Sequence, residues 1–228
     1  MSRIIEVRGA ASRTGKTTVL VNLATMFARQ HKVLYLHLGM GRDELGRWFD
    51  LPPPPRGPRW LHDRRERITD NLEVVRDMWD VRVDIDRLHR EYHYLFLDTE
   101  RASYSFRAPN LTLVAGGLNV FELGSLPTLK EELTGKRTLA VWQERWWPET
   151  DEEFEPEEEA EMAAYRAEQP GLFAAAYAAV APLWKIGLDA ASETALRSYR
   201  PAPPGSQSWQ GYQHLAREIA AQCQEQQG

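Results

Sequence analysis

Residues 4–28 read IIEVRGAASRTGKTTVLVNLATMFA, and this stretch decides the fold. Its first four residues are mostly apolar and predict a short buried strand. After the loop 10–14, apolar residues recur at helical spacing, which predicts an amphipathic helix beginning near Gly15-Lys16-Thr17-Thr18. A strand, a glycine-bearing loop, Gly-Lys-Thr-Thr and a helix in this order form the setting that a phosphate-binding loop requires.

Each part of this loop has a role in binding an anion. Successive backbone N–H groups and the free N-terminus of the helix favour a negative charge. Lys16 supplies a point charge for terminal phosphates, and the Thr17 hydroxyl completes a Mg²⁺ shell that keeps several waters. The candidate nucleotide-binding residues are Ser12, Arg13, Thr14, Gly15, Lys16, Thr17 and Thr18. The loop is irregular, because the usual spacing puts its first glycine at Ala10 and the glycine here is Gly9; an ordinary strand-to-helix turn is the alternative.

A second motif ends the apolar run YLFLD at 94–98. A carboxylate at the end of a buried strand is suited to accept a hydrogen bond from a Mg²⁺-bound water, and Asp98 has that place. Thr17 and Asp98 are therefore the candidate metal residues, and Lys16 and Asp98 are the candidate catalytic residues. The alternative is a strand-end or helix-capping aspartate.

Strands alternate with helices along most of the chain. Further strands are predicted at 33–38, 72–75, 94–97, 111–115, 138–142 and 183–188, and helices at 81–90, 127–133, 157–181 and 209–222. Several of these strands are continuous apolar runs, which indicates an α/β fold with a mostly parallel sheet covered by helices on both faces. The proline-rich stretches 52–58 and 201–204 read as loops, so residues 1–228 are expected to form a single domain.

Composition bounds the class of protein. Apolar residues make up 43% of the 228 and charged residues 27%, as in ordinary soluble globular proteins. The single cysteine, Cys223, excludes an internal disulfide framework and fits a reducing compartment. Residues 1–7 are too few and too charged to predict a signal peptide, and the apolar run 171–186 is too short to span a bilayer. We therefore expect a cytoplasmic protein that does not attach to membranes.

Charge is unevenly distributed. The net charge of -5 argues against a general nucleic-acid coat, yet residues 56–67 are basic and residues 149–161 are acidic. The simpler interpretation is that both stretches are solvent-exposed loop and helix surface. Alternatively, the basic stretch meets an anionic partner and the acidic stretch faces away from it.

The motifs together resemble the ParA/MinD family of deviant-Walker P-loop ATPases. Residues 15–38 are similar to the segment that opens these proteins, and residues 92–100 to their second acidic motif. Residues 110–126 and the tail 188–219 are similar to later parts of the family. The resemblance implies a SIMIBI-type P-loop NTPase fold, ATP and Mg²⁺ as cofactors, and a homodimer that forms with the nucleotide. It also implies ATP/ADP, non-specific DNA and a ParB-like adaptor as candidate partners.

The loop departs from the family's pattern where the partner subunit is reached. The family's signature lysine, which reaches the partner's phosphates, falls on Ala11, and two following glycines fall on Ser12 and Arg13. The resemblance therefore implies a weakened dimer contact, for which Arg13 is a candidate substitute.

The end of the second strand departs from the pattern as well. Two family aspartates, one of which orients the attacking water, fall on His37 and Gly39. Slow hydrolysis is expected, because alignment of the nucleophile is most of what such enzymes contribute. Asp43 and Glu44 are candidate replacements for the carboxylates, and His37 itself is interpreted as a satisfied strand-end histidine.

Three functions remain open. The first is a weak ATPase that partitions DNA or plasmids, or positions a cargo in the cell, through nucleotide-dependent dimerisation. The second is a hydrolysis-deficient nucleotide-binding scaffold. The third is a dethiobiotin-synthetase-like ligase, a relative that shares the longer spacing between Gly9 and Gly15. Trp146 and Trp147 lie where the family contacts the base, or else form a hydrophobic partner surface.

Overall fold

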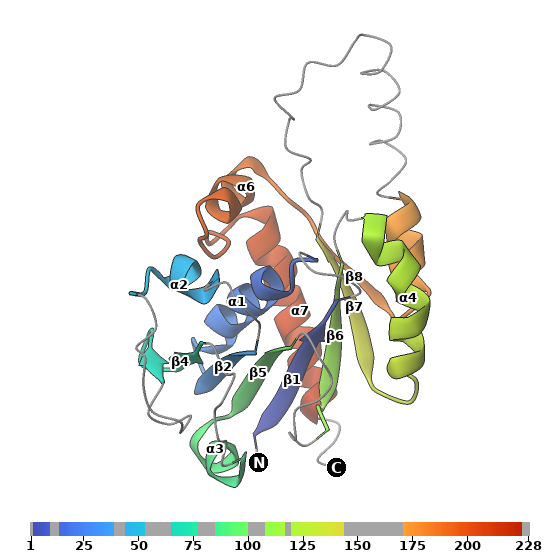
Figure 1. Cartoon of the computed structure of the whole chain (residues 1–228). Coiled ribbons are helices and arrows are strands. Elements are labelled where there is room, and N and C mark those ends of the chain that lie inside the picture. The colour runs from blue at the N-terminus through green and yellow to red at the C-terminus, as the bar shows by residue number, and fades with distance from the viewer. Residues whose placement is uncertain are drawn as a thin grey trace.

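Eight strands form one sheet, and helices pack on both of its faces (Figure 1). The computed structural model describes residues 2–9, 14–38, 44–52, 65–76, 85–99, 108–116, 120–143 and 171–224. In chain order the elements are β1 (Arg3–Arg8), α1 (Lys16–Phe27), β2 (Val33–Leu38), α2 (Glu44–Phe49), β3 (Glu66–Arg67), β4 (Leu72–Val75), α3 (Ile85–Glu91), β5 (Tyr94–Thr99), β6 (Leu111–Gly116), α4 (Val120–Glu132), β7 (Thr138–Gln143), β8 (Leu183–Ile186), α6 (Ala190–Arg197) and α7 (Gln207–Gln224). Residues 171–178 form a further helical stretch before β8.

The strand order places a switch point at β1. The order is β3-β4-β2-β5-β1-β6-β7-β8, and every neighbouring pair is parallel except β3 and β4. The chain leaves β1 toward β2 on one side, returns to β5, and then continues on the other side at β6. Open parallel sheets bind ligands beyond the carboxyl ends of the strands at such a reversal. The candidate phosphate loop follows β1, so it lies at this point.

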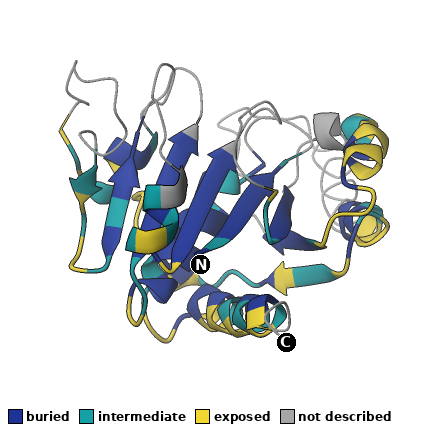
Figure 2. Ribbon diagram, turned by 90° about the horizontal axis from the view of Figure 1, so that it is seen from below, coloured by how far each residue is buried: buried dark blue, intermediate teal, exposed yellow. Residues whose placement is uncertain are grey.

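The alternation of side chains along β1 divides the core between the two faces. Ile5 and Val7 join a cluster with α1 and α7, whereas Ile4 joins a second cluster with Leu88 of α3. A third cluster packs α4 against β6 and β7. The central strands are buried almost throughout, and exposure concentrates on the outer sides of the helices (Figure 2). This burial explains why the strands read as continuous apolar runs.

Helix α1 is fixed by the C-terminal part of the chain. The side chain of Asn22 accepts a hydrogen bond from the Ala202 N–H at 2.7 Å and donates to the Thr18 carbonyl at 2.8 Å. The Arg29 guanidinium lies over the ring of Trp209, 4.2 Å from its centroid. The helix that follows the candidate phosphate loop is therefore braced by α7 and by the loop before it.

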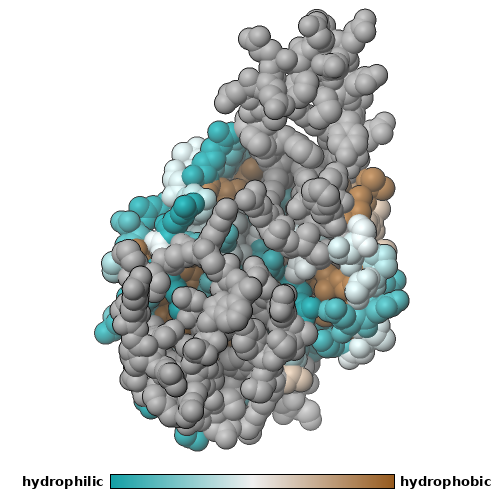
Figure 3. Space-filling view, viewed as in Figure 1, coloured by the Kyte–Doolittle hydropathy of each residue, from teal (hydrophilic) through white to brown (hydrophobic). Residues whose placement is uncertain are grey.

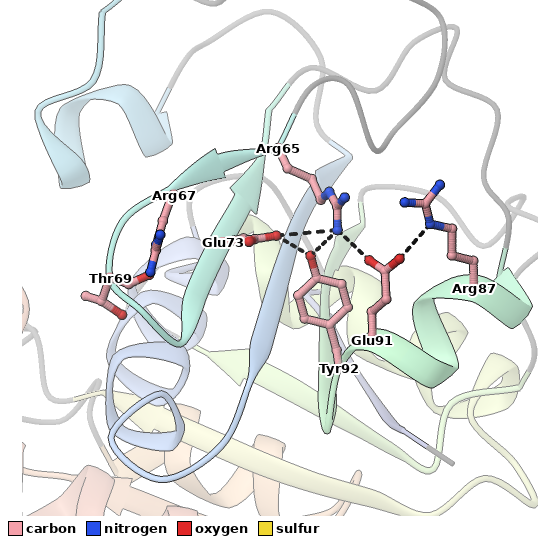
Figure 4. A network of polar contacts seen from close by, with 7 residues as sticks. All are labelled: Arg65, Arg67, Thr69, Glu73, Arg87, Glu91 and Tyr92. Carbon is pink, nitrogen blue, oxygen red and sulfur yellow. Dashed lines mark hydrogen bonds and ion pairs between the residues drawn. The ribbon is translucent and has the colours of Figure 1, made fainter.

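A polar network ties α3 to the outer strands (Figure 4). Arg65 donates to the Tyr92 hydroxyl at 2.8 Å and to Glu91 at 2.5 Å. The Tyr92 hydroxyl donates in turn to Glu73 of β4, and Arg87 of α3 donates to Glu91 at 2.6 Å. Each ionised group has an opposite charge as a neighbour, which suits this half-buried position.

Several predicted elements have different bounds. The helix expected at 127–133 begins seven residues earlier, at Val120, so Pro127 lies inside α4. Proline often opens a helix, which explains the misplaced start; here Pro127 is exposed inside α4. The strand expected at 183–188 ends at Ile186, and α7 begins two residues earlier than expected. Residues 81–84 and 157–170 of two predicted helices lie outside the described residues.

On the face seen in Figure 3, the described residues are mainly hydrophilic, with a few hydrophobic patches. Within this part of the chain the exposed large hydrophobic side chains are Leu172 and Tyr199. No helix among the described residues has the length and apolar character needed to cross a membrane.

Candidate nucleotide-binding site

The candidate phosphate loop joins the end of β1 to the start of α1. Gly15 precedes the helix in a left-handed conformation, with φ 87° and ψ 15°, which glycine adopts without the steric penalty of a side chain. Thr14 is fully buried, and Lys16, Thr17 and Thr18 form the first turn of α1. The other two candidate nucleotide-binding residues, Ser12 and Arg13, lie outside the described residues.

The first turn of α1 is suited to an anion. The leading N–H groups of a helix have no acceptor within the helix, and the helix dipole places positive potential there. The first turn of α1 carries no acidic side chain and includes Lys16. This end of α1 therefore has the backbone geometry and the charge of a phosphate-binding helix N-terminus.

Thr17 and Asp98 come together at this end of the sheet. The Thr17 hydroxyl donates to Asp98 Oδ2 at 2.8 Å, although 81 residues separate the two in sequence. Both side chains are buried, Asp98 with 3% exposure. A hydroxyl and a carboxylate are oxygen donors, the kind that Mg²⁺ prefers, and Mg²⁺ in nucleotide sites takes its remaining ligands from water and phosphate. The pair thus fits a Mg²⁺–nucleotide ion.

Among the described residues there is no group of three or more histidine, cysteine, aspartate or glutamate side chains that could hold a metal.

Two residues of β2 complete the surroundings of Asp98. Tyr35 donates its hydroxyl to Asp98 Oδ2 at 3.0 Å. His37 is the register partner of Asp98 in the neighbouring strand, and its Nε2 lies 3.9 Å from Asp98 Oδ2, beyond hydrogen-bond distance. Burial, followed by the charge of Asp98, raises the pKa of Tyr35 well above its usual value, so the hydroxyl remains a donor at neutral pH.

The expected replacements for the missing carboxylates are only partly described. His37 lies beside Asp98, where its imidazole cannot serve as an anionic base in the way a carboxylate does. Glu44 begins α2, whereas Gly39 and Asp43 lie outside the described residues, as do Ala11, Trp146 and Trp147.

Sequence reasoning missed two residues of this site. One is Tyr35, which reads as part of an apolar strand. The other is Gln143 at the end of β7, whose Nε2 donates to the Gly15 carbonyl at 3.2 Å; the Val19 N–H donates to the same carbonyl at 3.0 Å. The alternation of side chains along a strand could have indicated Tyr35, because residues 35 and 37 lie on the same face of β2. That signal is usable only when β5 is known to be the neighbour of β2.

Comparison with known proteins identifies the fold. No model of a protein family matches the chain, and no curated protein matches its sequence. Solved structures do match over nearly the whole chain. MinD from Pyrococcus horikoshii, complexed with Mg-ADP, has a TM-score of 0.63 and is 18% identical, with 96% of each chain covered.

Two further structures extend this comparison. Apo McdA from Cyanothece has a TM-score of 0.67 at 13% identity, covering 94% of this chain and 99% of its own. A plasmid partition protein from Borrelia burgdorferi has a TM-score of 0.54 at 9% identity, covering 97% of this chain and 100% of its own.

An eight-stranded, mostly parallel sheet with helices on both faces is the fold of the P-loop NTPase class that these solved structures share. Within that class, the chain has the fold of MinD, McdA and the ParA-like plasmid partition proteins. The predicted fold, and the resemblance to ParA and MinD as a likeness of fold, are thereby confirmed.

Proposed function

We propose that this chain is a ParA-like nucleotide-binding protein, a slow ATPase that partitions DNA or positions a cargo through nucleotide-dependent assembly. The observation that carries the proposal is the hydrogen bond between Thr17, in the first turn of α1, and Asp98, at the end of β5. It joins the two halves of a Mg²⁺–nucleotide site across the switch point of the sheet. Solved structures of the same fold contain Mg-ADP or ATP, and their names include a cell division ATPase and a plasmid partition protein.

Each residue has a defined part in this function. The N–H groups of the first turn of α1 would hold the phosphates, and Lys16 would place a positive charge on them. The hydroxyl oxygen of Thr17 and the carboxylate of Asp98, which accepts from Thr17, would hold Mg²⁺ directly or through water. A bound ion would supply charge neutralisation at the phosphates. Mg²⁺ and ATP are accordingly the proposed cofactors, and the residues of 12–18 with Asp98 are the proposed site.

Slow hydrolysis follows from the residues at positions 37 and 39, where the resembled family has two aspartates, one of which orients the attacking water. Such a carboxylate contributes to catalysis through alignment, and neither His37 nor Gly39 carries one. Phosphate release should be far below the roughly 1–100 s⁻¹ of efficient phosphotransferases. A rate within that range, abolished by Asp43→Ala, would show that the catalytic carboxylate lies elsewhere. A nucleotide that binds and is never hydrolysed would favour the scaffold, the second candidate function.

Calorimetry tests nucleotide binding itself. ATP is titrated into wild type and Lys16→Ala, each with Mg²⁺. Loss of the charge on the terminal phosphates should weaken binding at least tenfold, about 1.4 kcal/mol. Lys130→Ala, an exposed lysine near the end of α4, is the control and should bind as wild type does. Equal dissociation constants for wild type and Lys16→Ala would remove the phosphate-loop assignment.

A further inference from the structure

The hydroxyl of Tyr35 is buried in the middle of an apolar strand. Its residue is fully buried, and the residues before and after it on β2, Leu34 and Leu36, are fully buried too. A buried hydroxyl costs free energy unless it is hydrogen-bonded. In the described part of the chain its hydrogen bond goes to Asp98 Oδ2, at 3.0 Å.

Two donors from different elements share one oxygen of Asp98. The Thr17 hydroxyl comes from α1 at 2.8 Å, and the Tyr35 hydroxyl comes from the neighbouring strand β2. Rotation of a carboxylate about its last bond is soft, so it takes its orientation from the hydrogen bonds it accepts. With Oδ2 held by both donors, the orientation of the other oxygen is fixed as well.

The two donors differ in mobility. Thr17 lies in the first turn of the phosphate-binding helix, and its hydroxyl oxygen has a second use as a ligand of the ion. Tyr35 has one rigid ring held by a packed core that includes Phe96 and Val33. Tyr35 is therefore the donor that the packed core, and not the first turn of α1, holds in place.

We infer that Tyr35 is a positioning residue, which holds Asp98 in the orientation that receives the Mg²⁺ of a bound nucleotide. The inference rests on the proposed function, since it deepens the role of Asp98 in that site. If Tyr35 served only to fill the core, removing its hydroxyl could change the stability of the fold but would not change the affinity for Mg²⁺.

The test separates the hydroxyl from the ring. Tyr35→Phe keeps the ring and removes the donor. A fluorescent ADP analogue is bound to each protein in EDTA and then at rising Mg²⁺ concentrations. Loss of a group that orients a metal ligand typically costs about 10–100-fold in metal affinity. The Mg²⁺ concentration at half-maximal binding should therefore be at least about tenfold higher for Tyr35→Phe than for wild type. Its affinity in EDTA should stay within twofold of wild type, a change no larger than about 0.4 kcal/mol.

Tyr94→Phe is the matched control. Tyr94 is a buried tyrosine on β5, the strand of Asp98, but its hydroxyl accepts from Arg3 at 3.2 Å instead. This variant should show the wild-type Mg²⁺ requirement. A double-mutant cycle with Asp98→Asn adds the second criterion: Tyr35→Phe should have no further effect on the Mg²⁺ requirement in that background.

The outcomes distinguish the two levels of the argument. A wild type that binds no nucleotide overturns the proposed function, and this inference with it. A wild type that requires Mg²⁺ and a Tyr35→Phe variant with the same requirement overturn the positioning role alone. If Tyr35→Phe does not fold, fluorotyrosine is placed at 35 in the wild-type chain. Its ¹⁹F resonance should then shift on addition of Mg²⁺ to the ADP complex, while that of fluorotyrosine at 94 should not; an unmoved resonance at 35 overturns the inference.

Discussion

Gly116 ends β6 directly against the ring of Tyr177, and a Cβ atom built at this glycine would lie 2.6 Å from Tyr177 Cζ. Tyr177 is fully buried, so an added methyl group would have to displace a ring packed in the core. Gly116→Ala should lower the free energy of unfolding by about 1–3 kcal/mol, the usual cost of overpacking a core. Urea denaturation measures it.

Gly124→Ala is the control for that substitution. Gly124 is exposed within α4, and a Cβ there meets nothing within 4 Å. Alanine in an exposed helix should raise stability by roughly 0.5–1 kcal/mol. If Gly116→Ala were as stable as Gly124→Ala, the expected clash of a Cβ atom at residue 116 with the Tyr177 ring would be contradicted.

His31 gives the protein a pH dependence of known sign. Partial burial, then His93 and Arg3, lower the pKa of His31 from 6.5. Because the unfolded chain binds this proton more readily, stability is fully present above pH 6.5 and is lost as pH falls through the lowered pKa. The urea midpoint of wild type should therefore fall more between about pH 7.5 and about pH 5.5 than that of His31→Gln. Equal losses in the two proteins would contradict the shift.

At the scale of elements, the network around Tyr92 joins α3 to β4 and to the residue before β3 (Figure 4). Burial first, and then the bond to Glu73, raise the pKa of Tyr92 well above its usual value, so its hydroxyl stays protonated and donates to Glu73. Tyr92→Phe removes the hydrogen bonds of the hydroxyl with Glu73 and Arg65, while the ion pairs of Arg65 with Glu73 and Glu91 remain. The change should therefore lower the free energy of unfolding by about 0.5–1.5 kcal/mol.

An exposed ion pair in the same region provides the comparison. Arg67 pairs with Asp70 at 2.6 Å, and both side chains are largely in solvent. Arg67→Ala should change the free energy of unfolding by less than about 0.5 kcal/mol, since such pairs contribute little. Chemical denaturation of both variants measures the difference. If Tyr92→Phe and Arg67→Ala lowered the free energy of unfolding equally, the network around Tyr92 would not stabilise the contact of α3 with β4.

The sequence predicts the central strands well because these strands are buried and therefore consist of continuous apolar runs. The apolar runs at 33–38 and 94–97 lie in β2 and β5, and Asp98 directly follows the second run, as expected, within β5. The edge was missed for the opposite reason. β3 is only Glu66 and Arg67, and its pairing is supported by a tertiary contact, the ion pair of Glu66 with Arg76 at 2.6 Å.

The candidate site divides in the same way. Thr17 and Asp98 belong to motifs with recognisable spacing, so the sequence alone predicts their roles. Tyr35 has no motif, because its hydroxyl matters only when β2 lies beside β5 with His37 opposite Asp98. Register between strands far apart in sequence comes from the assembled sheet, which local patterns do not specify.

At the scale of the whole molecule, assembly should be weak. In the proposed function, Ala11 occupies the position of the lysine that in the resembled family reaches across to the partner's phosphates, so an ATP-dependent dimer would lack that contact. Sedimentation velocity with and without ATP and Mg²⁺ should show a small shift toward dimer, reduced further by Arg13→Ala. A tight ATP dimer that survives Arg13→Ala would show that no cross-subunit cation is needed.

DNA binding, as part of the same proposal, should run through arginines near the end of α6 or in residues 56–67. Arg200 is exposed, whereas Arg197 is paired with Glu193 at 2.7 Å. Contacts to phosphate are independent of sequence, so affinity should fall steeply with salt. Arg200→Ala should reduce the salt slope by about one, and Lys130→Ala on α4 should leave it unchanged. A protein that ignores DNA at low salt, with and without ATP, would favour the scaffold.

The packing of α1 against α7 also has a consequence for folding during synthesis on the ribosome. The loop 9–18 leaves the ribosome early, but the apolar face of α1 packs against Trp209, Leu215 and other residues of α7, which are synthesised about two hundred residues later. Until then, that face is exposed to solvent in the nascent chain. Contacts so distant in sequence form slowly, and open apolar surfaces recruit chaperones or aggregate. Ribosomes that stop before α7 should therefore release chains that are degraded and do not accumulate as nucleotide-binding fragments.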